Sequence, residues 1–300
     1  MVDLTAGRAR PGAMAFVLLT VALSWSIWIV AWFVTGRPAT TTASAGMVVA
    51  VYAGSFAPGI AAAILSALSP RGSLKEWLRG FVRARCGWRA YAAALLPLPL
   101  ALLLLTFVLG YEARLEGLHG QPVVLLYLTI FPVSIFNGLA TALMGAGPLG
   151  EEGGWRGYLL PRLLEQGGDA RASLIIGIVW ALWHLPIMAM FADWRSGVSF
   201  LTYVPLYTAG IIGLSFVMSR VWLIGGGSLI PCIWLHGLVN AVGGVAFDHR
   251  LWTSRWSAEA GTMHFAVATA ATAALLAVAR RRRSTNRLVR NEIMGRHRNR

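Results

Sequence analysis

The sequence predicts an all-α fold, a polytopic membrane helix bundle of about eight transmembrane helices with both termini in the cytoplasm. Three observations lead to this prediction. The chain is 57% hydrophobic and only 13% charged. Several of its apolar runs approach or exceed the roughly 20 residues that a helix needs to cross a bilayer. Its arginines gather in particular segments outside those runs, and such clusters favour the cytoplasmic side.

Eight apolar runs are the expected transmembrane helices, and together they form a single membrane domain over residues 1–279. They cover residues 13–35, 46–68, 90–110, 122–146, 172–191, 199–219, 228–247 and 262–279. The first run follows Arg8 and Arg10 and so resembles a signal peptide. Its apolar stretch is longer than the roughly 7 to 15 residues of such a peptide. We therefore expect it to be retained as the first span.

The basic residues set the expected orientation. Between the second and third spans the chain carries Arg71, Lys75, Arg79, Arg83, Arg85 and Arg89, whereas the first loop has only Arg37. Residues 280–300 add nine arginines and form a basic cytoplasmic tail, which contributes to the net charge of +14. We expect this tail to face anionic membrane lipids and not nucleic acid, because it lacks interleaved aromatic side chains. Cys86 and Cys232 fall in an inside loop and a span, where free thiols are expected.

Ionisable side chains are costly at membrane depth and persist mainly where they pair or line a cavity. The candidates are Glu151, Glu152 and Arg156 after the fourth span, His184 in the fifth, and His236 with Asn240 in the seventh. Each motif alone is also compatible with a structural role. Because buried polar groups need partners, we expect the three segments to satisfy one another.

The first group lies in GPLGEEGGWRGYLLPRL, residues 147–163. If the chain is helical from about residue 149, Glu152 and Arg156 stand at i and i+4 and can pair, while Glu151 points about 100° away. The glycines permit close approach of another helix or of a substrate, and Pro148 kinks or starts the helix. We place Glu151 near the cytoplasmic end of the fourth span. The alternative is a solvated cytoplasmic loop whose acids and arginines face water.

Such a set of side chains indicates a hydrolase. A carboxylate and an imidazole can deprotonate a water, and a second imidazole with a carboxamide can donate hydrogen bonds to an oxyanion. Glu151, His184 and His236 could instead hold a zinc ion with an open position for water. We expect no obligatory metal, because Arg156 adds positive charge and Asn240 suits an oxyanion donor. No HExxH motif is present, which excludes the common zincin arrangement.

These residues resemble the CPBP family of intramembrane proteases. EEGGWR at 151–156 matches EExxxR, WALWH at 180–184 matches the aromatic and histidine motif, and HGLVN at 236–240 matches HxxxN, in the family's order. The resemblance covers residues 122–247, a core shared with eukaryotic CAAX prenyl endopeptidases and with bacterial relatives linked to bacteriocin immunity. It implies that Glu151 and His184 activate the water, that His236 and Asn240 stabilise the oxyanion, and that Glu152 and Arg156 support them.

The resulting hypothesis is an intramembrane endopeptidase that cleaves a membrane-associated peptide or protein substrate. The arginine and alanine bias indicates a bacterial cytoplasmic membrane, where a prenylated CAAX protein is not expected. A catalytically silent immunity or binding membrane protein that keeps the motifs is the alternative. A transporter with a proton relay is a further alternative, but transporters often have internal repeats and none is seen here.

Overall fold

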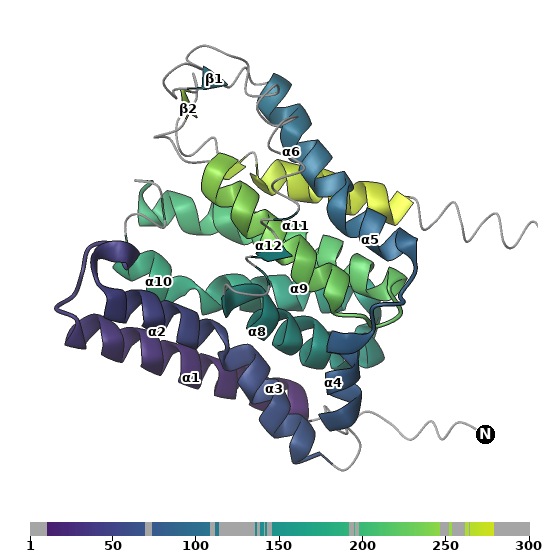
Figure 1. Cartoon of the computed structure of the whole chain (residues 1–300), viewed down its shortest axis with the longest axis horizontal. Helices are drawn as coiled ribbons and strands as arrows, with labels where there is room; N and C mark the ends of the chain where they lie inside the picture. Colours follow the sequence, from purple (N-terminus) through teal and green to yellow (C-terminus); the bar gives the residue numbers. More distant parts are fainter. Residues whose placement is uncertain are drawn as a thin grey trace, which may run out of the picture.

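The computed structural model describes most of the chain and shows an assembly of helices (Figure 1). The described residues are 11–69, 74–108, 112–113, 136, 139–140, 142, 146–191, 195, 198–246, 252–253, 262–263 and 265–278. The expected all-α fold holds apart from one short pairing. The two-residue strands β1 (Glu112–Ala113) and β2 (Trp252–Thr253) pair antiparallel, with Glu112 opposite Thr253.

The N-terminal half contains six α-helices and one short 3-10 turn among its described residues. They are α1 (Pro11–Val34), η1 (Thr41–Ala43), α2 (Ala45–Ser55), α3 (Ala57–Ala67), α4 (Leu74–Val82), α5 (Trp88–Leu95) and α6 (Pro97–Val108). The second expected span, 46–68, is divided between α2 and α3 at Phe56, one residue before a helix that has Pro58 in its first turn. The third, 90–110, is likewise divided between α5 and α6, where Pro97 begins the second helix. Proline lacks the backbone N–H that would continue the preceding helix, which explains both breaks.

The C-terminal half carries the three motifs. Its elements are α8 (Ala146–Gly154), the π-helical turn η2 (Trp155–Leu159), α9 (Leu160–Trp183), α10 (Leu185–Met190), α11 (Phe200–Ile224), α12 (Ile230–Ala246) and a last helix at Phe265–Val278. The hypothesis of a solvated loop after the fourth span is wrong. Residues 147–190 are helical almost throughout, and the bend within them falls at Gly167 and Gly168, the latter with φ +77°.

Four described helical segments are long and apolar enough to cross a membrane: Gly12–Val34, Ala45–Ala67, Gly147–Met190 and Phe200–Ile224. Shorter apolar helices cover Trp88–Leu102, Ile230–Asn240 and Phe265–Val278. Each expected span other than 122–146 overlaps one of these, and 122–146 lies almost wholly outside the described residues. The structure therefore supports a membrane protein, while eight spans and cytoplasmic termini stay predictions.

The site helix α8 packs unusually close to the α2–α3 junction. A β-carbon on Gly150 would lie 2.6 Å from Phe56 Cα, and one on Gly154 would lie 2.5 Å from Pro58 Cβ. Contacts this short leave no room for a side chain, so the glycines serve the close helix approach that their spacing predicts. This contact fixes the segment that carries Glu151 and Glu152.

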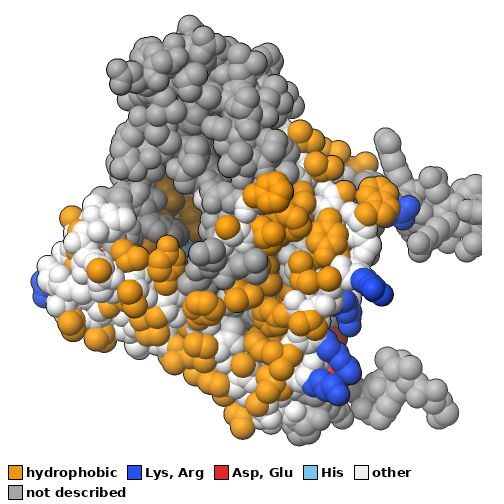
Figure 2. All heavy atoms as spheres, viewed as in Figure 1, with side chains coloured by type: hydrophobic (Ala, Val, Ile, Leu, Met, Phe, Trp, Pro, Cys, Tyr) orange, Lys and Arg blue, Asp and Glu red, His pale blue; other side chains and the backbone are white. Residues whose placement is uncertain are grey.

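The surface agrees with a membrane setting. Hydrophobic side chains cover much of the face shown in Figure 2. Among the described residues, Leu18, Val30, Val49 and Leu68 are exposed. The Lys and Arg side chains gather mainly along one edge, where α4 lies in Figure 1. Cys86 and Cys232 are both free thiols.

Candidate active site

A buried ionic cluster joins the first and third motifs. Arg156 Nη1 donates to Glu152 Oε1 at 3.1 Å, which realises the pairing expected at i and i+4. The same oxygen lies 2.8 Å from His236 Nδ1 in α12. The Glu152 and Arg156 side chains are 0% exposed and that of His236 is 6% exposed. Glu152 thus holds His236 by Nδ1 and directs its Nε2 away from the carboxylate.

Glu151 occupies a different environment from its neighbour. Its Oε2 accepts a hydrogen bond from Trp180 Nε1 at 2.7 Å, and the residue is only 5% exposed. It therefore makes none of the hydrogen bonds that hold the Glu152 cluster together, and its bond with Trp180 does not use Oε1. The two adjacent carboxylates are divided as the helical spacing predicts, one paired with a cation and one on a separate face.

His184 ends α9 and is held by the backbone. Its Nδ1 lies 2.9 Å from the carbonyl oxygen of Trp180 and 3.3 Å from the Tyr207 hydroxyl. A carbonyl oxygen can only accept, so Nδ1 carries the hydrogen. In the neutral imidazole Nε2 is then the nitrogen without a hydrogen, and it can accept a proton from water or bind a metal.

Trp180 is the centre of the arrangement. Its ring lies 5.2 Å from that of His236 and 6.4 Å from that of His184, and Arg156 Cζ lies 4.6 Å from the ring centroid. The buried Arg156 Nε and Nη2 have no hydrogen-bond partner within the described part of the chain, so this cation–π contact supplies part of their stabilisation.

Trp180 was noted in the sequence only as an aromatic position near His184. Tyr207 was missed, because a tyrosine in an apolar helix has no distinguishing pattern.

Asn240 lies one turn after His236 on α12 and is exposed. A β-carbon on Gly147 would lie 3.1 Å from Glu151 Oε1 and 3.8 Å from Asn240 Nδ2, so the carboxylate and the amide flank the same glycine. All six predicted residues therefore gather around Trp180 and Gly147. The expected place of Glu151 at the cytoplasmic end of the fourth span stays a prediction, because residues 122–146 lie almost wholly outside the described residues.

Whether a metal is required stays a prediction. Within the described residues, no three or more His, Cys, Asp or Glu side chains are arranged as a metal-binding group. His236 Nδ1 and Glu151 Oε2 are engaged by Glu152 and Trp180. Zinc binding by Glu151, His184 and His236 would therefore use the other nitrogens and the other carboxylate oxygen.

Comparisons with known proteins identify the segment. Residues 131–242 match the family model described as type II CAAX prenyl endopeptidase Rce1-like. This segment is similar to Rce1-like domains. A stretch of 92 residues is 28% identical to the CAAX prenyl protease 2 of Methanococcus maripaludis, covering 30% of this chain and 34% of that protein. The chain thus aligns with about a third of the length of this relative. The Rce1-like segment contains all six predicted site residues.

Proposed function

We propose that this protein is an intramembrane endopeptidase that hydrolyses peptide bonds of membrane-associated substrates with water activated by Glu151 and His184. The observation that carries the proposal is the way in which Trp180 holds both Glu151 and His184. Glu151 has one carboxylate oxygen on Trp180 and the other beside Gly147. His184 has its donor nitrogen committed to a carbonyl, which leaves Nε2 as a proton acceptor.

The reaction follows from these atoms. Glu151 and His184 take a proton from water, and the resulting hydroxide attacks the scissile carbonyl carbon. His236, whose Nδ1 is held by Glu152, and Asn240 Nδ2 donate hydrogen bonds to the developing oxyanion. The proton then passes to the leaving amine as the carbon–nitrogen bond breaks. Glu152 and Arg156 stay paired throughout and keep His236 oriented.

The substrate class remains part of the proposal. The matched family model and the named relative both point to CAAX prenyl substrates. The arginine and alanine bias of this chain instead favours a bacterial membrane peptide without a prenyl group. A farnesylated CAAX peptide and a non-prenylated membrane peptide, each supplied in vesicles with the purified protein, distinguish the two.

The decisive experiment compares membrane peptides from cells that carry the wild type or Glu151→Ala. We expect uncleaved peptides to accumulate in the variant while the protein still inserts and folds. Survival of the biological function in Glu151→Ala would overturn the endopeptidase proposal in favour of a binding or immunity role.

A further inference from the structure

Helix α4 touches both segments that carry the ionic cluster, although no predicted site residue lies on it. Trp77 Nε1 donates to the Gly153 carbonyl oxygen at 2.8 Å, one residue after Glu152. One turn further along α4, the Gly80 carbonyl accepts from Leu229 N at 2.9 Å, one residue before α12 begins. One short helix thus bridges the carboxylate segment and the segment of His236.

The contact at Gly153 falls where the helix changes its hydrogen-bond spacing. Helix α8 ends at Gly154, and in η2 Leu160 N bonds to the Trp155 carbonyl five residues earlier. Such a change of spacing is often found at functional sites. The Trp77 indole binds at this junction, beside the Glu152–Arg156 pair that spans it.

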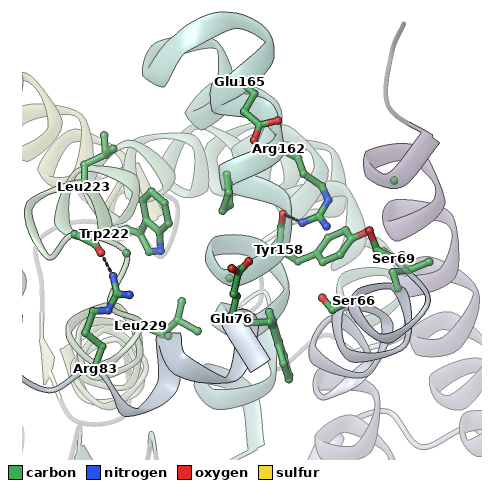
Figure 3. A pocket seen from close by; sticks show the side chains of 18 of the residues that line it. Ser66, Ser69, Glu76, Arg83, Tyr158, Arg162, Glu165, Trp222, Leu223 and Leu229 are labelled. Atoms are coloured by element: carbon green, nitrogen blue, oxygen red, sulfur yellow. Dashed lines mark hydrogen bonds between the residues drawn. The ribbon is translucent and has the colours of Figure 1, made fainter. Parts of the chain in front are cut away.

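Helix α4 is held by the hydrogen bonds above and by Trp77 and Phe81, which pack against the buried cores. None of its residues is fully buried, and Leu74, Leu78 and Val82 form an exposed apolar stripe. A cavity of about 950 Å³ separates much of it from α1, α3 and α9 (Figure 3). Figure 3 shows Glu76 of α4 between a side that carries Arg83, Trp222 and Leu229 and a side that carries Tyr158, Arg162 and Ser66. Close packing on that face therefore cannot hold the helix in place.

The end of α4 is tied to the turn before α12. Arg83 Nη1 donates to the Gly226 carbonyl, and Ser228 Oγ donates to the Arg83 carbonyl at 2.7 Å. Gly226 and Gly227 have φ of +57° and +88°, which a glycine turn adopts without strain. This glycine turn is thus fixed to the end of α4.

We infer that α4 is a positioning element of the active site and that Trp77 is a positioning residue for the Glu151–Glu152 segment. The inference rests on the proposed endopeptidase function. Loss of the indole hydrogen bond leaves the glutamates, Arg156 and His236 chemically intact but releases the helix junction that sets their spacing. A small misplacement of catalytic groups lowers turnover much more than substrate binding.

The test compares Trp77→Phe with Trp88→Phe in the full-length protein in nanodiscs. Trp88 is the matched control, since it is 74% exposed at the start of α5. Hydrogen–deuterium exchange should rise by about tenfold at residues 149–160 and 228–238 in Trp77→Phe only, as expected for the loss of one hydrogen bond. This readout needs no substrate, so it decides the inference even if the wild type cleaves nothing.

Kinetics provide the second readout, with a peptide that accumulates in Glu151→Ala membranes as the probe. In Trp77→Phe, kcat should fall by about tenfold to a hundredfold with KM nearly unchanged. A wild type without cleavage would contradict the proposed function alone. A cleaving wild type, together with a Trp77→Phe variant that matches Trp88→Phe in exchange and in kcat, would overturn the positioning role.

A second variant approaches the same contact from the other side. A β-carbon on Gly153 would lie 2.7 Å from Phe81 Cζ, so Gly153→Ala should push α4 away and reproduce the Trp77→Phe effects. Adding Phe81→Leu removes that ring carbon and should restore part of kcat. Equal activity of Gly153→Ala and wild type would contradict the inference, even if Trp77→Phe did not fold.

Discussion

The two histidines of the site are held in opposite ways. In α12, His236 places Nδ1 on the Glu152 carboxylate, which also pairs with Arg156, so this region is ionic. At the end of α9, His184 places Nδ1 on a backbone carbonyl, and its ring centroid lies 4.6 Å from that of Trp183. An uncharged group therefore holds this nitrogen, and an aromatic ring packs against the imidazole.

The difference teaches which role each imidazole suits. A carboxylate that accepts from Nδ1 fixes the ring beside the ion pair and turns Nε2 away from it, where it can face an oxyanion. A carbonyl partner fixes the tautomer without adding charge, and the other nitrogen stays a proton acceptor. The His236 region therefore fits oxyanion stabilisation, and the His184 region fits proton abstraction beside Glu151.

The largest expected effect concerns the proton-accepting region. Glu151→Gln and His184→Gln should each lower kcat by about 10² to 10⁴, because a general base contributes a rate factor of this size. Cleavage of the accumulating membrane peptide by purified protein measures the change. Glu165→Gln, an exposed position near the cavity, is the matched control. Near wild-type turnover in Glu151→Gln would remove the proposed base.

Substitutions in the Glu152–Arg156 pair should lower the free energy of unfolding as well as activity. Glu152→Met leaves the buried Arg156 without its carboxylate and should cost about 3 to 5 kcal/mol in the free energy of unfolding. The double variant Glu152→Met with Arg156→Met should recover much of that loss, since an apolar pair often replaces a buried ion pair without penalty. Unfolding in detergent measures both, and activity should stay low in each. A single variant as stable as wild type would show that the pair is solvated.

Asn240→Ala tests the oxyanion side of the comparison. Loss of one donor should remove about 2.7 to 4 kcal/mol of transition-state stabilisation and leave residual cleavage, because His236 still donates. The ratio of kcat/KM for wild type and variant gives the value. If cleavage were unchanged, Asn240 would have no place at the oxyanion.

A smaller effect should follow removal of the Tyr207 hydroxyl, which lies 3.3 Å from His184 Nδ1. Tyr207→Phe removes one neutral hydrogen bond. The activation free energy derived from kcat should rise by about 0.5 to 1.5 kcal/mol. Tyr203→Phe is the matched control, because its ring stacks on that of Tyr207 at 5.5 Å without reaching His184 by a hydrogen bond among the described contacts. Equal activity of the two variants would show that the carbonyl alone orients His184.

The smallest expected effect is that of metal removal. If Glu151 and His184 activate water by themselves, prolonged chelation and dialysis should leave cleavage unchanged, and metal analysis of the purified protein should find no stoichiometric zinc. Activity lost with zinc and restored by its addition would overturn this expectation. Glu151, His184 and His236 would then be the ligands to test, and the contrast between the histidines would need revision.

The sequence by itself determined the helical membrane class, the candidate residues and the local Glu152–Arg156 pair. These depend on apolar run length, residue type and a spacing of four residues, all of which act within one helix. The resemblance to the protease family also required only the order of three motifs, and the match over residues 131–242 confirms it.

Only the tertiary structure decided which partner holds each site residue. His236 meets Glu152 across 84 residues, and Trp180 reaches Glu151 across 29. The same holds for Trp77, whose indole finds Gly153 across 76 residues. Contacts of this range follow from how helices pack, and the close α8 approach to Phe56 and Pro58 sets that packing here. Helical periodicity assigns a side chain to a face of its own helix, but the helix opposite that face is chosen by the whole bundle.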